Sequence, residues 1–374
     1  MKKALIGTSA LIAVGLLSAQ AANAADKISL GLSGNYRVVG GFVNQDDGTG
    51  QGAANTRSHG IGTDGLITFR GSTTLDNGIE VGVSADLELQ ETGGAGGGDT
   101  IDEHYIWLEN QDVWGRIEMG DRDGAHNKMN TLAPFVFGVS IVGVQTIQLA
   151  TAPTGSGGFI LLVPRSSDAT KVTYYTPKFG GFQLGISYTP DNNENIGRFG
   201  AGTTTENDAG AVDQFIDLGA NWNGKLGDAS VSASAAYSTA SAEAANSNDL
   251  KEWNAGLKVS MMGWSFGAQY KNEDDSSPGD VSTIRDTERV SWKVSGTYAT
   301  GPWLLGIEYA QEDTEVTATT EDQVTVWGVG AKRTLGPGVS AGLAVHIWEW
   351  EDDANAVAAQ NDATEILLIT EVSF

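Results

Sequence analysis

The sequence predicts an all-β protein in which about sixteen antiparallel strands close into a transmembrane β-barrel. Apolar and polar residues alternate with a period of two along most of the chain, which is typical of strands with one apolar and one polar face. Short connections alternate with long polar ones. The chain has no cysteine, whereas 50 of its 374 residues are glycine, which indicates many tight turns and close backbone approaches.

The predicted strands follow one another along the chain. In the first, Ile28, Leu30 and Leu32 alternate with polar or small residues. The clearest strand follows an Asp-Asn-Gly turn at 76–78, and its apolar residues from Ile79 to Leu89 all fall on one face. The inward face of 103–110 stays ambiguous, because four consecutive residues there are apolar. The full set is 28–38, 67–70, 79–90, 103–110, 114–120, 171–176, 182–188, 215–222, 230–237, 253–261, 264–270, 290–298, 303–309, 324–333, 339–348 and 364–374.

The connections favour a barrel over a β-sandwich or a jelly roll. Every second connection is short and built on Gly, Asn, Asp or Pro, and the others are long, polar and often acidic, as at 44–64, 272–286, 311–322 and 349–362. Up-and-down barrels in outer membranes have short turns at one end and long loops at the other. Closure also leaves no strand edge unpaired in lipid.

Aromatic residues support a membrane environment. On four strands, two of them stand six positions apart on one face: Phe182 and Tyr188, Trp264 and Tyr270, Trp292 and Tyr298, and Trp303 and Tyr309. That spacing is roughly 20 Å along a strand, which fits two aromatic girdles around an apolar band. The alternative is the aromatic core of a soluble β-protein.

The first strands carry a different set of outward residues, chiefly Leu, Ile and Val. These are Leu30, Leu32, Ile67, Ile79, Val81 and Val83. A wall that faces protein does not need interfacial aromatics. We therefore hypothesise that the first strands, together with the last, form the subunit interface of an oligomer.

The N-terminus has the features of a secretory signal peptide, residues 1–24. Lys2 and Lys3 precede an apolar stretch, and Ala22-Asn23-Ala24 is a small-residue cleavage site. The mature chain is expected to begin at Ala25. A membrane anchor is the alternative.

The longest connection runs from Asp121 to Asp168 and carries no charged residue between Met129 and Pro164. Part of it, 132–152, has the length and apolarity of a membrane helix. The rhythm of strands around it instead predicts the third long loop of a barrel. Structureless loops of this length usually carry function or disorder.

Several classes of function are excluded. The net charge of −25 argues against nucleic acid binding, because phosphate contacts need an excess of Lys and Arg. We expect no enzyme, because no Gly-x-Ser-x-Gly, Walker or dinucleotide motif is present. No metal-ligand spacing connects the histidines, His59, His104, His126 and His346. No cofactor is expected, although acidic loop clusters at Asp46-Asp47 and Glu273-Asp274-Asp275 could hold Ca²⁺ or Mg²⁺ between lipopolysaccharide phosphates.

The chain resembles the general porins of Gram-negative bacteria, particularly the alphaproteobacterial group. The resemblance rests on the signal peptide, on Thr68-Phe69-Arg70-Gly71, on Gly120-Asp121-Arg122-Asp123-Gly124 before the longest loop, and on the terminal Phe374. It covers the mature chain, 25–374. It implies a homotrimer of sixteen-stranded barrels in the outer membrane, surrounded by lipid and lipopolysaccharide, with loop 121–168 folded into the pore. It also implies passive diffusion of ions and small hydrophilic solutes, and recognition of Phe374 by the outer-membrane assembly machinery.

Strand alternation points Arg37, Arg70 and Arg116 inward, with Arg122 just beyond them. The resemblance implies that these arginines face carboxylates on the inserted loop, of which Asp121 and Asp123 are nearest. The alternative is that they pair with Glu80 or Glu118 on the wall. The loop then narrows the pore either through Asp121 and Asp123 or by its apolar bulk.

Two other functions stay open at this point. One is a channel of the same fold that selects a particular sugar or organic ion. The other, from a different class, is a secreted β-sandwich hydrolase or adhesin. Ion selectivity is also open, because acidic mouths favour cations whereas an arginine-lined constriction opposes them.

Overall fold

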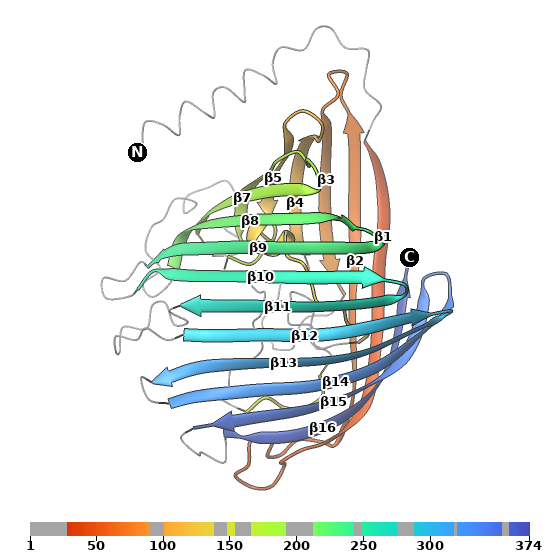
Figure 1. Ribbon diagram of the computed structural model, residues 1–374, viewed down its shortest axis with the longest axis vertical. Coiled ribbons are helices and arrows are strands. Elements are labelled where there is room, and N and C mark those ends of the chain that lie inside the picture. Colours follow the sequence, from red (N-terminus) through yellow and green to blue (C-terminus); the bar gives the residue numbers. More distant parts are fainter. Residues whose placement is uncertain are drawn as a thin grey trace.

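The computed structural model describes residues 28–89, 101–137, 148–153, 166–191, 212–242, 248–274, 288–317, 320–353 and 359–374. In this part of the chain, sixteen antiparallel strands form one closed barrel (Figure 1). Each strand pairs with its neighbours in sequence, and β1 pairs with β16 to close the sheet. The predicted all-β barrel of sixteen strands is confirmed. The predicted signal peptide lies outside the described residues.

The strand bounds differ from the predicted ones mainly at the ends. The elements are β1 (Ser29–Asn44), β2 (His59–Thr74), β3 (Glu80–Glu88), β4 (Ile101–Asn110), β5 (Gly115–Asp121), the short helix α2 (Ala125–Lys128), β6 (Thr170–Tyr175), β7 (Phe182–Asp191), β8 (Val212–Leu226), β9 (Ala229–Ala242), β10 (Leu250–Met261), β11 (Trp264–Asp274), β12 (Glu288–Thr300), β13 (Trp303–Thr317), β14 (Thr320–Gly336), β15 (Val339–Asp352) and β16 (Asn361–Ser373).

Tight turns join alternate strand pairs at one end of the barrel, here called the short-turn end; the other is the long-loop end. Met262 and Gly263 connect β10 to β11 with φ angles of 53° and 85°. Two consecutive positive φ angles are typical of the two-residue turns whose twist matches that of paired strands. Both chain ends of the barrel, at Ser29 and Phe374, also lie at the short-turn end (Figure 1).

One predicted loop is wrong. Residues 311–322 are mostly strand, because β13 continues to Thr317 and β14 begins at Thr320. Glu315 and Glu321 are still register partners there. Thr and Val favour extended backbone, so the pairing continues although the side chains become polar. β11 and β15 likewise extend into predicted acidic loops, as far as Asp274 and Asp352.

The outer face is apolar and has aromatic rings near both ends. Trp264 and Tyr298 stack with ring centres 4.4 Å apart toward the short-turn end. Toward the long-loop end, the ring of Tyr309 lies 5.0 Å from that of Trp292 and 4.6 Å from that of Trp327. Because these rings touch across neighbouring strands, the predicted girdles are continuous there rather than isolated pairs.

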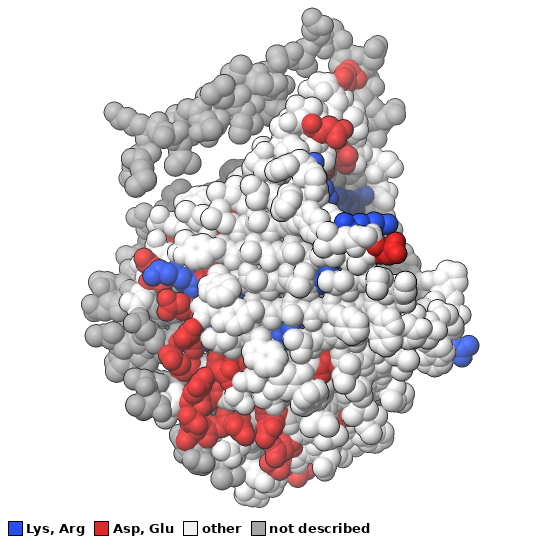
Figure 2. Space-filling view, in the orientation of Figure 1, with Lys and Arg blue, Asp and Glu red and all other residues white. Residues whose placement is uncertain are grey.

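Acidic side chains gather beyond these rings, at the long-loop end of β11 to β16 (Figure 2). The exposed carboxylates of this region are Asp274, Glu288, Glu321, Glu349, Glu351, Asp353 and Asp362. Much of the charge of the chain therefore lies outside the apolar band.

The barrel wall is low on one side. Within the described residues, β5 and β6 have 7 and 6 residues, and β3, β4 and β7 have 9 or 10, whereas the other strands have 11 to 17. At about 3.3 Å per residue and a tilt of about 45°, seven residues span only roughly 16 Å, less than an apolar band of about 25 Å.

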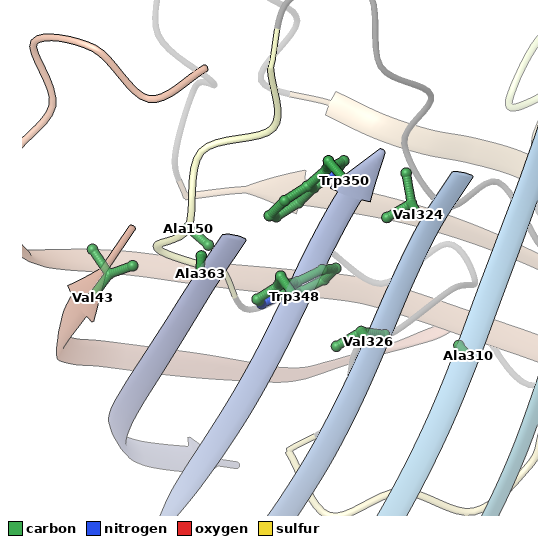
Figure 3. Packing of buried hydrophobic residues seen from close by; sticks show 8 residues of the cluster. All are labelled: Val43, Ala150, Ala310, Val324, Val326, Trp348, Trp350 and Ala363. Carbon is green, nitrogen blue, oxygen red and sulfur yellow. The ribbon is translucent and has the colours of Figure 1, made fainter. Parts of the chain in front are cut away.

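The buried residues lie inside the barrel. One cluster joins Val324, Val326, Trp348 and Trp350 on β14 and β15 to Ala150, which belongs to the long connection between β5 and β6 (Figure 3). No helix in the described part of the chain is both long and apolar enough to span a membrane. The described parts of 132–152 are not helical, so the membrane-helix alternative is not supported there.

Candidate pore lining

Strand alternation gives the barrel a polar interior. On β11, the outward Trp264 and Phe266 are about half exposed, whereas the inward Gln269, Lys271 and Glu273 are buried. The inward charges pair with one another. Lys271 Nζ lies 2.8 Å from Glu252, and Lys293 Nζ lies 2.6 Å from Glu308. Such pairing offsets the cost of removing each charge from water.

Three of the predicted arginines form one stack with aromatic rings on the wall of β2, β4 and β5; we call it the arginine ladder. The guanidinium carbons of Arg70 and Arg116 lie 4.4 and 4.8 Å from the centre of the Trp107 ring. Arg122 lies 3.9 Å from the centre of the Tyr105 ring. Contact with an aromatic face stabilises a cation and restricts its orientation. The ladder therefore presents guanidinium groups to the barrel interior in fixed positions.

Wall carboxylates neutralise part of this ladder. Arg116 contacts Glu109 at 2.7 Å and Glu118 at 2.5 Å, and Arg122 contacts Glu118 at 3.1 Å. The alternative that the arginines pair with Glu118 is thus confirmed for two of them. Glu80 instead accepts a hydrogen bond from the indole nitrogen of Trp107 at 3.4 Å.

Arg37 lies apart from the ladder, on β1. Its side chain contacts Glu371 on β16 at 3.2 Å and Asp64 on β2 at 3.9 Å. Glu371 also lies 3.3 Å from Lys332. Arg37 therefore belongs to a second charged group near the junction of β1 and β16.

An acidic cluster lies next to the ladder. Glu103, Asp123 and Asp168 offer carboxylate oxygens within 4.8 Å of one another. Lys128 on α2 contacts Glu103 at 2.7 Å and Asp123 at 3.4 Å, so an ammonium group already supplies positive charge there. Burial, together with Asp123 and Glu103, raises the pKa of Asp168 to about 8. The same two carboxylates raise the pKa of Lys128 above its usual value, against the effect of burial.

The structure corrects the assignment of Asp121. β5 extends to this residue, and alternation from the inward Arg116 and Glu118 turns Asp121 away from the barrel interior, although the residue is only 6% exposed. It accepts a hydrogen bond from Thr170 and lies 3.5 Å from the imidazole of His104, whose side chain is 53% exposed. Asp123, two residues later, is the predicted carboxylate that remains near the ladder.

The connection between β5 and β6 contacts inward-facing side chains of strands far away in sequence. The backbone N–H groups of Ala125, Thr131 and Ala133 donate hydrogen bonds to Ser187 on β7, Ser234 on β9 and Gln269 on β11, at 2.7, 2.7 and 3.0 Å. These bonds satisfy backbone donors that have no strand partner.

Two buried histidines lie at contacts of this connection. His126 of α2 is fully buried, and its Nε2 lies 2.9 Å from the side-chain nitrogen of Asn254. Burial lowers its pKa. Farther along, Glu365 on β16 accepts hydrogen bonds from the backbone N–H groups of Leu149 and Ala150 at 2.6 and 2.9 Å. His346 Nδ1 and Trp348 Nε1 lie 2.8 and 3.0 Å from its other oxygen.

The predicted site residues thus divide into groups. Arg70, Arg116, Arg122, Glu80 and Glu118 lie together, Arg37 lies in its own group, and Asp121 is buried beside Thr170 and His104. Sequence reasoning missed Tyr105, Trp107, Glu103 and Glu109, because both faces of 103–110 contain apolar residues. The sequence did contain a signal, because Glu103, Tyr105, Trp107 and Glu109 occupy alternate positions and therefore share one face of the strand.

The terminal residue, Phe374, forms two backbone hydrogen bonds with Gly34 on β1, at 2.9 and 3.0 Å.

Part of the chain is similar in sequence to a curated outer membrane protein. The outer membrane porin protein 32 of Delftia acidovorans is 27% identical over 202 residues, which cover 53% of this chain and 52% of that protein. The aligned part thus spans about half the length of this curated relative.

Solved structures share the fold. The anion-selective porin from Comamonas acidovorans has a TM-score of 0.63 at 17% identity, covering 93% of this chain and all of that one. The outer membrane channel DcaP of Acinetobacter baumannii has a TM-score of 0.63 at 14% identity and covers 95% of this chain and 100% of its own. The trimer form of OmpT from Vibrio cholerae has a TM-score of 0.62 at 11% identity, with 93% and 100% coverage. Identities this low show the fold alone.

The family model described as Gram-negative porin matches residues 7–346, nearly the whole chain. Together with the closed barrel of sixteen strands and its charged interior, this match identifies the family that the sequence resembles. The chain belongs to the Gram-negative porins.

Proposed function

We propose that this outer-membrane barrel is a diffusion channel, which passes ions and small hydrophilic solutes down their gradients without a catalytic step. The observation that carries the proposal is the contrast between the two faces of one closed sheet. The outer face is apolar with aromatic girdles, and the inner face carries paired charges such as Lys271 with Glu252. A polar interior inside an apolar wall is typical of barrels with an aqueous lumen.

The experiment is conductance in planar lipid bilayers. Purified wild-type protein is expected to insert in discrete steps with a linear current–voltage relation at low voltage. Its current should rise with salt concentration and should not saturate at low solute concentrations. Protein that stays in buffer without detergent, and adds no conductance steps, would contradict the channel function and favour the secreted hydrolase or adhesin.

We also propose that the connection 121–168 narrows the channel. Contacts of 125–137 with side chains of β7 to β11, and of Leu149 and Ala150 with Glu365, support this proposal. Because 129–164 carries no charge, the loop would narrow the channel mainly by bulk, with Asp123 as its nearest carboxylate.

A channel selective for one sugar or organic ion is the second candidate. The arginine ladder favours it, because Arg70 has an exposed guanidinium whose position is restricted by Trp107. Competing solutes in the bilayer assay separate the two functions. Saturable block by one solute at low concentration would favour the selective channel.

The assembly is proposed to be a homotrimer. The low wall at β5 and β6 supports this assembly. Strands this short do not span the apolar band, and a partner subunit would cover the part that they leave open. Apolar residues exposed on the outer face of this wall include Val83, Ile106 and Val172.

Contacts with the envelope are also proposals. The terminal Phe374, with its ring exposed at the short-turn end, would be read by the assembly machinery. The acidic end of β11 to β16 would lie beside lipopolysaccharide, where divalent cations could link carboxylates such as Asp274 and Glu288 to lipid phosphates. A chelator without effect on thermal stability would contradict the cation link.

A further inference from the structure

Seven glycines form a track across the inner wall beneath residues 125–137; we call it the glycine lane. Each lies at an inward-facing position of its strand. At each, a Cβ atom would come within 3.1 Å of an atom of 125–137, closer than real Cβ contacts allow without movement. The lane consists of Gly185 on β7, Gly219 on β8, Gly256 on β10, Gly267 on β11, Gly306 on β13, Gly330 on β14 and Gly342 on β15.

The lane is continuous where its strands are adjacent. Gly185 is the register partner of Gly219, and Gly306 is the register partner of Gly330. None of the seven has a positive φ angle, so the backbone dihedral angles there do not by themselves call for glycine. At six of the seven, the atom nearest to an added Cβ belongs to 125–137; at Gly342 the backbone oxygen of Ala331 on β14 is nearest, followed by the ring of Phe137. Glycine at those six positions is therefore explained by the space that the loop occupies. Its presence in strand interiors is otherwise unfavourable.

Hydrogen-bond acceptors lie beside the lane. Ser234 and Gln269 are the register partners of Gly256 on its two sides, and they accept the N–H groups of Thr131 and Ala133. A Cβ at Gly256 would collide with the carbonyl oxygen of Thr131 itself. The loop backbone thus rests directly on the wall, with no side chain between.

The opposite kind of surface covers another part of the wall. β2, β4 and β5 carry the arginine ladder, whose side chains are among the longest in the chain. The lane is confined to β7 through β15. Large side chains and a flattened loop therefore occupy different sectors of the interior.

We propose that the glycine lane sets the bore of the channel. The lane keeps 125–137 flat on its sector of the wall, and the width left beside it depends on residues hidden behind the loop. A side chain added to the lane lifts the loop toward the interior and narrows the passage, although the added atoms never touch a solute. The inference rests on the proposed function, in which 121–168 narrows the channel.

The test replaces Gly256 by Ala and by Val. Because the colliding atom belongs to the Thr131 backbone, the loop must move. Single-channel conductance is expected to fall, and to fall further for Val than for Ala. The matched control is Gly62→Val on β2, an inward position with no atom within 4 Å of its Cβ. This control should keep wild-type conductance. Heat-modifiable migration on SDS gels shows whether each variant is folded.

A second position, Gly306, tests the proposal independently in case the Gly256 variants do not fold. A Cβ at Gly306 would lie 2.6 Å from Cγ2 of Val136, so Gly306→Ala should lower conductance. Val136→Ala removes that methyl group and should restore conductance in the double variant. A merely structural defect in β13 would not be rescued in this way.

The outcomes separate the two levels of inference. Wild-type conductance in folded Gly256→Val, or a Gly306→Ala loss that Val136→Ala does not restore, would overturn the lane proposal alone. A wild-type protein that forms no channel would instead overturn the proposed function, and the lane proposal with it.

Discussion

At the scale of single residues, Asp168 is a carboxyl group whose charge depends on pH near neutrality. Because burial, Asp123 and Glu103 raise its pKa to about 8, it is mostly neutral in acid and becomes ionised as the pH rises through that value. Since its folded pKa lies above the ordinary value of 3.8, its contribution to stability is largest in acid and is lost as pH rises to about 8. Ionisation also adds negative charge beside Asp123 and Glu103.

We therefore expect the wild-type channel to become more cation-selective between pH 6 and pH 9, measured as the reversal potential in a KCl gradient. Asp168→Asn should lose most of this shift. Asp228→Asn, an exposed carboxylate in the turn between β8 and β9, is the matched control and should retain it. An equal shift in wild type and Asp168→Asn would refute the assignment.

Residue-level prediction from sequence succeeded where alternation is clear and failed where it is not. Arg70 and Arg116 were placed inward because polar and apolar residues alternate around them. Asp121 was misplaced because its strand was predicted to end one residue earlier, at Gly120. Trp107 was missed because apolar residues occur on both faces of its strand, although the glutamates at 103 and 109 share its face.

At the scale of elements, Glu365 on β16 holds the second limb of the long loop. It is fully buried, and its oxygens meet two backbone amides, an indole and an imidazole. Hydrogen bonds to a charged acceptor contribute about 1.5–3 kcal/mol each. Glu365→Gln keeps the size but turns an NH₂ group toward donors.

The expected result for Glu365→Gln is a free energy of unfolding lower by about 2 kcal/mol or more, together with more frequent closures in single-channel records. Urea titration followed on SDS gels measures the first effect. Asp362→Asn, exposed on the outer face of the same strand, should change neither. If Glu365→Gln lowers the free energy of unfolding but does not increase the frequency of closures, Glu365 stabilises the barrel and not the position of the loop.

The existence of the strands was predictable from the sequence, but the residues at which they end were not. β13 and β14 continue past their apolar residues because pairing between Thr-rich polar segments still satisfies the backbone. The path of 125–137 depends on Ser187, Ser234 and Gln269, which lie 62 to 136 residues away from their partners. No local pattern contains that information.

At the scale of the whole molecule, we propose that a second copy packs against the low wall. Leu30→Asp and Val81→Asp put charge on the outer face of β1 and β3; β3 belongs to this wall, and β1 lies between β2 and β16. Burying an unpaired carboxylate between subunits costs several kcal/mol, so the double variant should run as a monomer on native gels while the barrel stays folded. Leu257→Asp, on the outer face of the taller β10, is a control that should leave assembly unchanged. Trimers that persist in the double variant would locate the interface elsewhere.

The contacts of Leu149, Ala150 and Thr151 have a consequence for how the barrel forms. Glu365 and Asn361 on β16 bind this segment, and Gln45, just after β1, accepts the N–H group of Thr151 at 2.9 Å. Asn361 and Gln45 also bond to each other across a separation of 316 residues. A segment from the middle of the chain thus forms hydrogen bonds on both sides of the junction between β1 and β16. We therefore expect closure of the barrel and placement of this segment to be coupled, so that neither is complete until the final strand has been released from the ribosome and exported.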